Sequence, residues 1–130
     1  MDKPAVAAWL EKYLAAWRSY DPAAIGALFT EDAVYRWHPW DETTEAAHGR
    51  DAIVASWVGD ADEPGSWEAE YRPWAVDGDR AVAVGVSTYF GPDRATVDRV
   101  YHNIFLMRFD GDGRCAEFTE LFMLKPDRTG

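Results

Sequence analysis

The sequence is short of the features that mark several protein classes. It contains one cysteine, Cys115, so no internal disulfide can form, and compartments that keep thiols reduced suit such a chain. No apolar run approaches the length that crosses a membrane, and the charged N-terminal segment does not have the form of a signal peptide. Basic residues are also few: 13 Lys and Arg stand against 23 Asp and Glu, a net charge of −10. That charge repels nucleic-acid phosphates and anionic membranes, so we expect a soluble cytoplasmic protein that binds neither.

Aromatic side chains, by contrast, are abundant. They make up 15% of the 130 residues and include seven Trp, within a hydrophobic content of 48%. A chain of this length suits a single domain, residues 1–130, with a sizeable core. Because a buried Trp needs a partner for its indole N–H, so many indoles predict a binding surface in addition to a core.

Helical periodicity predicts three helices in the first half of the chain. The first covers residues 2–20, with apolar side chains on one face. The second begins within residues 21–33, where Asp21 is the expected N-cap and Pro22 the first helical residue. A third, shorter helix is expected over residues 50–58.

Extended patterns predict strands elsewhere. One covers residues 33–40. Four longer strands follow, joined by short turns rich in Gly, Asp and Pro; they cover residues 67–76, 80–90, 96–110 and 114–124. Helices first and strands later indicate an α+β fold with helices on one side of an antiparallel sheet.

The strand at 80–90 is apolar or small on both faces. One face holds Val82, Val84, Val86, Thr88 and Phe90, and the other holds Ala81, Ala83, Gly85, Ser87 and Tyr89. Since helices can cover only one face, we expect a homodimer formed through the other. The small residues predict space beneath them, which a ligand could fill.

Glu120 stands out on the last strand. Alternation places it on one apolar face with Ala116, Phe118, Phe122 and Leu124. Burial there raises a carboxyl pKa and makes the group a proton carrier near neutral pH. The alternative, that Glu120 lies at a bulge or pairs with Arg36 or Arg99, stays open.

The three histidines differ in position. His38 is the second candidate proton carrier, with a rim residue hydrogen-bonded to its loop as the alternative. His102 and Asn103 point to opposite faces of their strand, so at most one enters a pocket, and His48 is expected on the surface. Their spacing, with one cysteine, does not fit a metal site, and we expect neither a metal nor an organic cofactor.

Three stretches carry a family resemblance: "LEKYLAAWRSYDPAAIGALFTEDAVY", "HGRDAIVASW" and "VYHNIFLMRFDGDGRCAEFTELF". Their order and spacing resemble the NTF2-like superfamily and, within it, the SnoaL-like group, over nearly the whole chain. The resemblance implies an α+β cone, with N-terminal helices packed on a curved antiparallel sheet. It implies no single reaction, because this fold hosts isomerases, dehydratases, cyclases, epoxide hydrolases and non-enzymatic modules.

Beside the steroid isomerases of this superfamily, Tyr13 falls where a helix-1 tyrosine donates a hydrogen bond to the substrate oxyanion. Their second donor, a protonated Asp, falls at Phe105. Their catalytic carboxylate falls at His38 when counted from Pro39 and at Trp37 when counted from the strand start.

Beside the limonene-type epoxide hydrolases, Tyr35 matches a tyrosine that holds the attacking water, and Glu120 falls at their catalytic Asp. Trp37 replaces their water-holding Asn, while Gly85 and Ser87 replace their Arg and Asp. Neither known site is complete in this sequence.

We therefore predict a small-molecule pocket. The catalytic candidates are Glu120, His38, Tyr13 and Tyr35, and the candidate wall residues are Trp17, Trp37, Trp57, Trp74, Asn103, Phe105 and Phe118. The expected activity is that of an isomerase, cyclase or dehydratase that transfers a proton on an apolar metabolite. A non-catalytic binding or dimerisation module of the same fold is the alternative.

Overall fold

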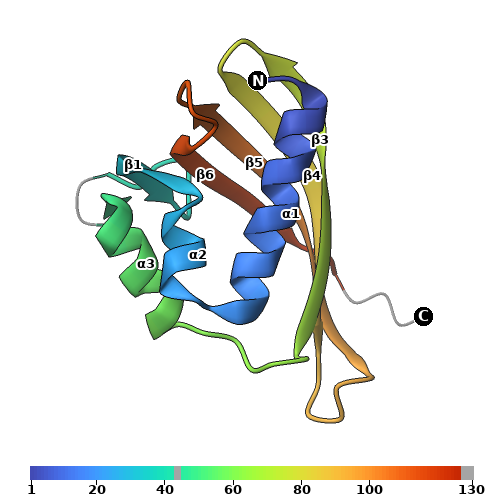
Figure 1. Ribbon diagram of the computed structural model, residues 1–130. Helices are drawn as coiled ribbons and strands as arrows, with labels where there is room; N and C mark the ends of the chain where they lie inside the picture. The colour runs from blue at the N-terminus through green and yellow to red at the C-terminus, as the bar shows by residue number, and fades with distance from the viewer. Residues whose placement is uncertain (43–44, 127–130) are drawn as a thin grey trace.

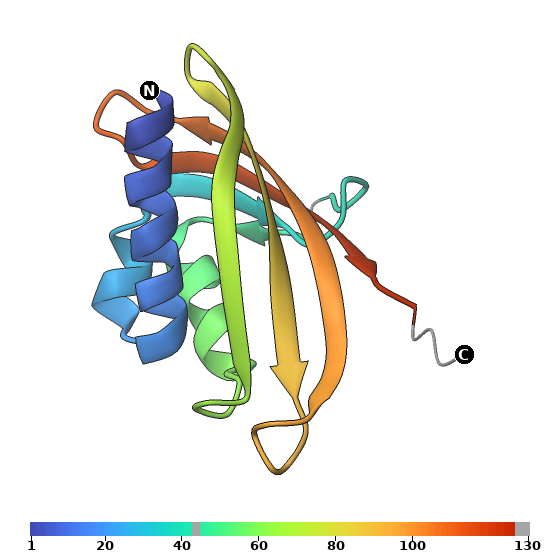
Figure 2. The same cartoon turned by 90° about the vertical axis from the view of Figure 1, so that its right-hand side faces the viewer.

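The structure is a computed structural model that describes residues 1–42 and 45–126. Helices α1 (Lys3–Ser19), α2 (Pro22–Gly26) and α3 (Arg50–Gly59) lie together on the concave side of a curved sheet (Figures 1 and 2). The Asp2 carboxylate caps α1, accepting a hydrogen bond from the Ala5 amide at 2.9 Å. None of the described helices has the length and apolar character needed to cross a membrane.

The strands form one sheet in the order β2-β1-β6-β5-β4-β3. Their bounds are β1 (Phe29–Arg36), β2 (Ala47–His48), β3 (Trp67–Asp77), β4 (Arg80–Phe90), β5 (Val97–Phe109) and β6 (Cys115–Leu124). Neighbours are antiparallel except β1 and β6, which pair in parallel. The predicted α+β class is confirmed, and β3 to β6 begin and end within one residue of the predicted positions.

The boundary between α2 and β1 differs from the prediction. The second helix ends at Gly26, and the strand begins at Phe29 rather than at residue 33. Tertiary hydrogen bonds account for the early strand: the Leu28 carbonyl accepts from Trp9 Nε1 at 3.1 Å and from the Cys115 amide at 2.8 Å. The Phe29 carbonyl accepts two bonds from the Arg50 guanidinium. These partners lie far away in sequence and override the local helical preference.

The strand β1 also ends earlier than predicted. It stops at Arg36 because the buried Asp41 carboxylate accepts hydrogen bonds from the amides of Trp37 and His38, at 3.0 and 3.1 Å. These bonds turn the chain away from the sheet.

The space predicted beneath the small residues of β4 is found only at one end of that face, where Ser87 and Tyr89 border a cavity. It is filled at Ala81, Ala83 and Gly85. Ala81 and Ala83 are buried within the apolar core. A Cβ on Gly85 would overlap the ring of Tyr71 and the carbonyl of Glu70. The space above Gly85 is therefore filled by a side chain of the neighbouring strand.

Candidate functional site

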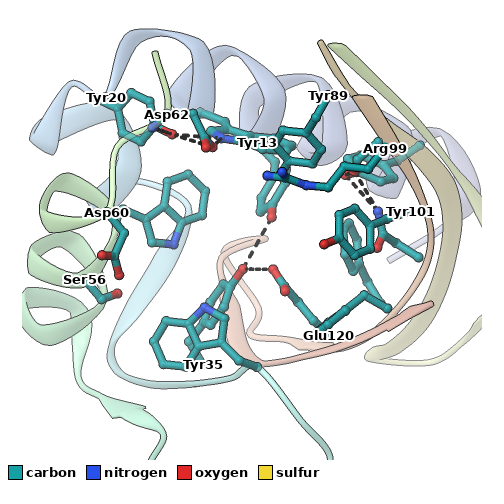
Figure 3. Close-up of a pocket in the computed structure, with 18 residues that line it drawn as sticks. Tyr13, Tyr20, Tyr35, Ser56, Asp60, Asp62, Tyr89, Arg99, Tyr101 and Glu120 are labelled. Carbon is teal, nitrogen blue, oxygen red and sulfur yellow. Dashed lines mark hydrogen bonds between the residues drawn. The ribbon is translucent and has the colours of Figure 1, made fainter. Parts of the chain in front are cut away.

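A cavity of about 360 Å³ lies between α1, α3 and the concave face of the sheet. Figure 3 shows side chains from all three converging on it. Eight of the residues predicted for the site line this cavity: Tyr13, Trp17, Tyr35, Trp37, Trp57, Asn103, Phe105 and Glu120. They come from α1, α3, β1 and its following turn, β5 and β6, so distant segments meet here.

Tyr13, Tyr35 and Glu120, which we call the carboxylate cluster, are linked by hydrogen bonds at the centre of the cavity (Figure 3). The Tyr35 hydroxyl donates to Glu120 Oε1. Its oxygen lies 3.4 Å from the Tyr13 hydroxyl. Because Tyr35 has one hydroxyl hydrogen and gives it to the carboxylate, Tyr13 must be the donor to Tyr35. Both tyrosine hydrogens are thus used within the cluster when Glu120 is ionised.

Glu120 lies in a regular part of the β5–β6 ladder, opposite Phe105, and not at a bulge. None of the ion pairs between described residues includes it. Burial raises the pKa of Glu120 from the ordinary 4.5 to about 7, while the hydrogen bond from Tyr35 and the nearby His38 act in the lowering direction. Of the two readings of the sequence, the structure therefore favours a partly buried carboxyl that borders the cavity and has no ion-pair partner among the described residues.

The two tyrosines of the carboxylate cluster remain protonated at neutral pH. Burial is the main cause that raises the pKa of Tyr13 and Tyr35 well above the ordinary value of 10.0, and the charge of Glu120 adds to it. Their rings are supported from behind by Phe118, whose centroid lies 5.5 Å from that of Tyr13 and 4.7 Å from that of Tyr35. The cluster is therefore held rigidly by stacked aromatic rings.

Tyr71, Ser87 and Asn103 form a second group of hydrogen-bonded side chains in the same cavity, which we call the amide cluster. Asn103 Nδ2 donates to Ser87 Oγ at 2.7 Å and to the Tyr71 hydroxyl at 3.3 Å. The Tyr71 and Ser87 hydroxyls are also hydrogen-bonded to each other. Gly85 makes this arrangement possible, because only a residue without a side chain lets the Tyr71 ring lie across β4.

The rim of the cavity combines aromatic rings with charges. Trp17 Nε1 lies 2.9 Å from the Tyr20 hydroxyl and 3.1 Å from Asp62 Oδ2, which joins the end of α1 to the loop before β3. Farther along the rim, the Arg99 guanidinium carbon lies 4.6 Å from the centroid of the Tyr89 ring, within cation–π range.

Three predicted site residues lie outside the cavity. The Phe118 side chain is fully buried in the core beneath the tyrosines. Trp74 is 61% exposed, because it shares the outward alternation of Glu70 and Arg72 on β3. His38 follows the early end of β1, and its ring stacks on Trp40 with Nδ1 3.2 Å from Asp41 Oδ1.

The sequence patterns did not identify Tyr71, Tyr20 and Asp62 as site residues. Arg99 was considered only as a possible partner of Glu120, and Ser87 only as a small residue of its strand and as a replaced family residue. The alternation of Trp67, Ala69 and Tyr71 could have placed Tyr71 on the inner face. No sequence signal marks Asp62, which lies in a loop. Among the described residues, no group of three His, Cys, Asp or Glu side chains is arranged to hold a metal ion.

The profile of the SnoaL-like domain family matches residues 10–118 of the chain. No curated protein matches it. Among solved structures, a candidate ketosteroid isomerase from Kribbella flavida has a TM-score of 0.68 at 21% identity, covering 99% of this chain and 85% of its own. An NTF-2 like protein of unknown function from Burkholderia xenovorans has a TM-score of 0.68 at 17% identity, covering 98% and 88%.

An LEH-like epoxide hydrolase from M. tuberculosis has a TM-score of 0.66 at 16% identity, covering 93% of this chain and 84% of its own. At these identities the likeness establishes the fold, which is NTF2-like, as the resemblance implied. The reaction must be sought in the side chains of the cavity.

Proposed function

This chain belongs to the SnoaL-like domain family, and from that premise we propose that it is an enzyme that transfers a proton on an apolar small molecule bound in the cavity. The proposed chemistry is that of an isomerase, a cyclase or a dehydratase, with Glu120 as the acid–base group. The supporting observation is a partly buried carboxyl on the cavity wall without an ion-pair partner among the described residues, and its raised pKa of about 7 would let it take up and release a proton near neutral pH.

The rest of the carboxylate cluster would position Glu120. Tyr35 occupies Oε1, and none of the hydrogen bonds between described residues reaches Oε2. We propose that Oε2 is the oxygen that exchanges a proton with the ligand. Tyr13 would act through Tyr35, because its own hydrogen is directed there. This differs from the role that the resemblance implied for Tyr13, that of a direct donor to the substrate.

Isotope exchange tests the proposal. An apolar bicyclic ketone with acidic C–H groups, 2-tetralone, is followed by NMR in D2O with the protein and with its Glu120→Gln variant. We expect the wild-type protein to accelerate loss of the α-proton and the variant to be slower by about 10²–10⁴-fold. A variant as fast as the wild type would show that Glu120 is not the base.

A specific observation favours the alternative, a non-catalytic binding module. The Phe105 side chain, 2% exposed, fills the position at which the resemblance calls for a second oxyanion donor. If the protein is a binding module, the ketone should change the Trp fluorescence on binding, but its α-proton should exchange no faster than in buffer. The two measurements together separate the functions.

We also propose that the protein acts in the cytoplasm as a homodimer formed through the outer face of the sheet, which none of the described helices covers (Figure 2). Ile104, Leu106 and Met123 are exposed on that side, next to a groove lined by Val84 and Val86. Such a surface can pair with its own copy about a twofold axis. Light scattering at micromolar concentration should give twice the 14.7 kDa of the chain; the monomer mass would contradict it.

A further inference from the structure

The amide cluster has no part in the proton transfer proposed above, yet it is built into the same cavity. Ser87 and Asn103 are 3% and 8% exposed. Polar groups buried to that degree are normally satisfied by hydrogen bonds. Counting the hydrogens of the cluster shows which of its groups are already satisfied and which are free to meet a ligand.

The count fixes the orientation of the Asn103 amide. The three side chains make three mutual contacts, and each contact needs one hydrogen. The hydroxyls of Tyr71 and Ser87 have only two hydrogens between them, so the third must come from the amide. Only an amide that presents Nδ2 to both hydroxyls satisfies all three contacts, and Oδ1 therefore points elsewhere.

One hydrogen-bond donor and one hydrogen-bond acceptor of the amide cluster then remain without a partner. The cluster has four polar hydrogens and uses three, so one hydroxyl hydrogen is left over whichever hydroxyl donates to the other. No side-chain hydrogen bond from another described residue reaches Asn103 Oδ1, and no buried side-chain polar atom of the described residues lacks a partner. Oδ1 therefore faces open space. Asn103 borders both the cavity and the outer groove, and its hydrogen bonds to Tyr71 and Ser87, which line the cavity, place its amide on the cavity side.

We infer that the amide cluster binds a hydroxyl group of the ligand, which accepts the spare hydrogen of Tyr71 or Ser87 and donates its own hydrogen to Asn103 Oδ1. A ligand hydroxyl can accept the spare hydrogen and donate its own hydrogen to the amide oxygen. A carbonyl or an ether oxygen can only accept a hydrogen, and it leaves the amide oxygen without a partner. The inference rests on the proposed function in one respect, that the ligand occupies this cavity.

The carboxylate cluster does not offer the same combination. With Glu120 ionised, both of its hydrogens are used internally and only acceptors remain. Of the two clusters, only the amide cluster has a permanent hydrogen-bond donor beside a permanent acceptor. The substrate class that fits both clusters is thus an apolar molecule with a hydroxyl group held at one point and a mobile proton near Glu120.

Calorimetric titration with two matched probes tests the inference. 2-Naphthol carries a hydroxyl group, and 2-methoxynaphthalene replaces its hydrogen with a methyl group. At neutral pH we expect the wild-type protein to bind 2-naphthol about fivefold more tightly, which is the worth of one hydrogen bond. Asn103→Leu should bring the ratio of the two affinities close to one, while Glu120→Gln should keep it. The steric effect of the methyl group cancels when ratios are compared between proteins.

Three outcomes overturn the inference: a wild-type protein without the preference, one that binds neither probe, or an Asn103→Leu variant that keeps the preference. If Glu120→Gln removes the preference and Asn103→Leu keeps it, the hydroxyl binds Glu120, and the proposed function survives without this inference. If Asn103→Leu does not fold, a crystal structure of the wild-type complex decides. A naphthol oxygen within hydrogen-bond distance of Asn103 Oδ1 supports the inference, and any other position refutes it.

Discussion

The carboxylate cluster and the amide cluster share one cavity and consist of similar oxygen atoms, but they differ in their hydrogens. The first has two hydrogens for two contacts when Glu120 is ionised and gains a third on protonation. The amide cluster has four polar hydrogens for three hydrogen-bond contacts at any pH near neutrality, since burial keeps the pKa of Tyr71 above its ordinary value. One cluster therefore changes with pH and the other does not. This difference assigns any pH dependence of the cavity near neutrality mainly to Glu120.

Gly85→Ala is expected to have the largest effect, because it breaks the amide cluster and spares the carboxylate cluster. The new Cβ would overlap the Tyr71 ring and the Glu70 carbonyl, and the carbonyl belongs to a paired strand that cannot move freely. We expect a loss of about 3 kcal/mol in the free energy of unfolding, measured by urea denaturation. Gly59→Ala is the matched control: nothing lies within 4 Å of its new Cβ, so it should not destabilise the protein.

Glu120→Gln removes the titrating group and so abolishes the difference between the clusters. A carboxyl whose folded pKa is raised from 4.5 to about 7 makes the fold less stable as pH rises from about 4.5, and the loss levels off above about 7. Since Glu120 borders the cavity, we expect the variant to be more stable than the wild type by about 2 kcal/mol at pH 8 and equal to it at pH 4.5.

Thermal unfolding at these two pH values measures the effect. Glu117→Gln, on the same strand but 46% exposed beside Arg108, should show no comparable gain at pH 8. A Glu120→Gln variant that loses stability at pH 8 would mean that the carboxylate is held by a favourable partner, contrary to its position in the cavity.

Tyr35→Phe sharpens the comparison by removing the one hydrogen that Glu120 accepts. That hydrogen bond acts to lower the pKa of Glu120, so its loss should raise the titration midpoint of the carboxyl by roughly one pH unit. Carbon NMR of the Glu120 carboxyl carbon follows the midpoint directly. An unchanged midpoint would indicate that the Tyr35 hydroxyl does not donate to Glu120 in solution.

Tyr13→Phe should produce the smallest effect of the series. Tyr13 reaches Glu120 only through Tyr35, and its contact with Tyr35 is 3.4 Å long. We expect the Glu120 midpoint to rise by roughly a few tenths of a pH unit, through weaker polarisation of the Tyr35 hydroxyl. A shift as large as that of Tyr35→Phe would show that Tyr13 contacts the carboxyl itself.

The two clusters could be predicted to different extents, because one has a member that a pattern within a single strand reveals and the other does not. Glu120 was found from the sequence because alternation within one strand shows a carboxylate on an apolar face. The amide cluster joins three strands, and its geometry depends on a ring crossing Gly85, which no local pattern records. Trp74 was an avoidable error, since its alternation with Glu70 and Arg72 already indicates the outer face. The starts of the helices and the hairpins were predictable, because helix caps and turns are formed by residues that are close together in the sequence.

The early start of β1 was not predictable for a related reason. Its first residue, Phe29, pairs with Cys115 in parallel, and a parallel partner at the other end of the chain leaves no trace in the sequence nearby. The same pairing explains why the second helix ends at Gly26, earlier than expected.

The position of Cys115 has a practical consequence for kinetic experiments. It is the one cysteine of the chain, its side chain is fully buried where β6 meets β1, and burial raises its pKa above the ordinary thiol value. A thiol reagent can reach it only after these two strands separate. The rate of labelling therefore reports how often the parallel junction opens, and a ligand in the cavity that slows labelling would reveal that it binds the closed form more tightly than the open form.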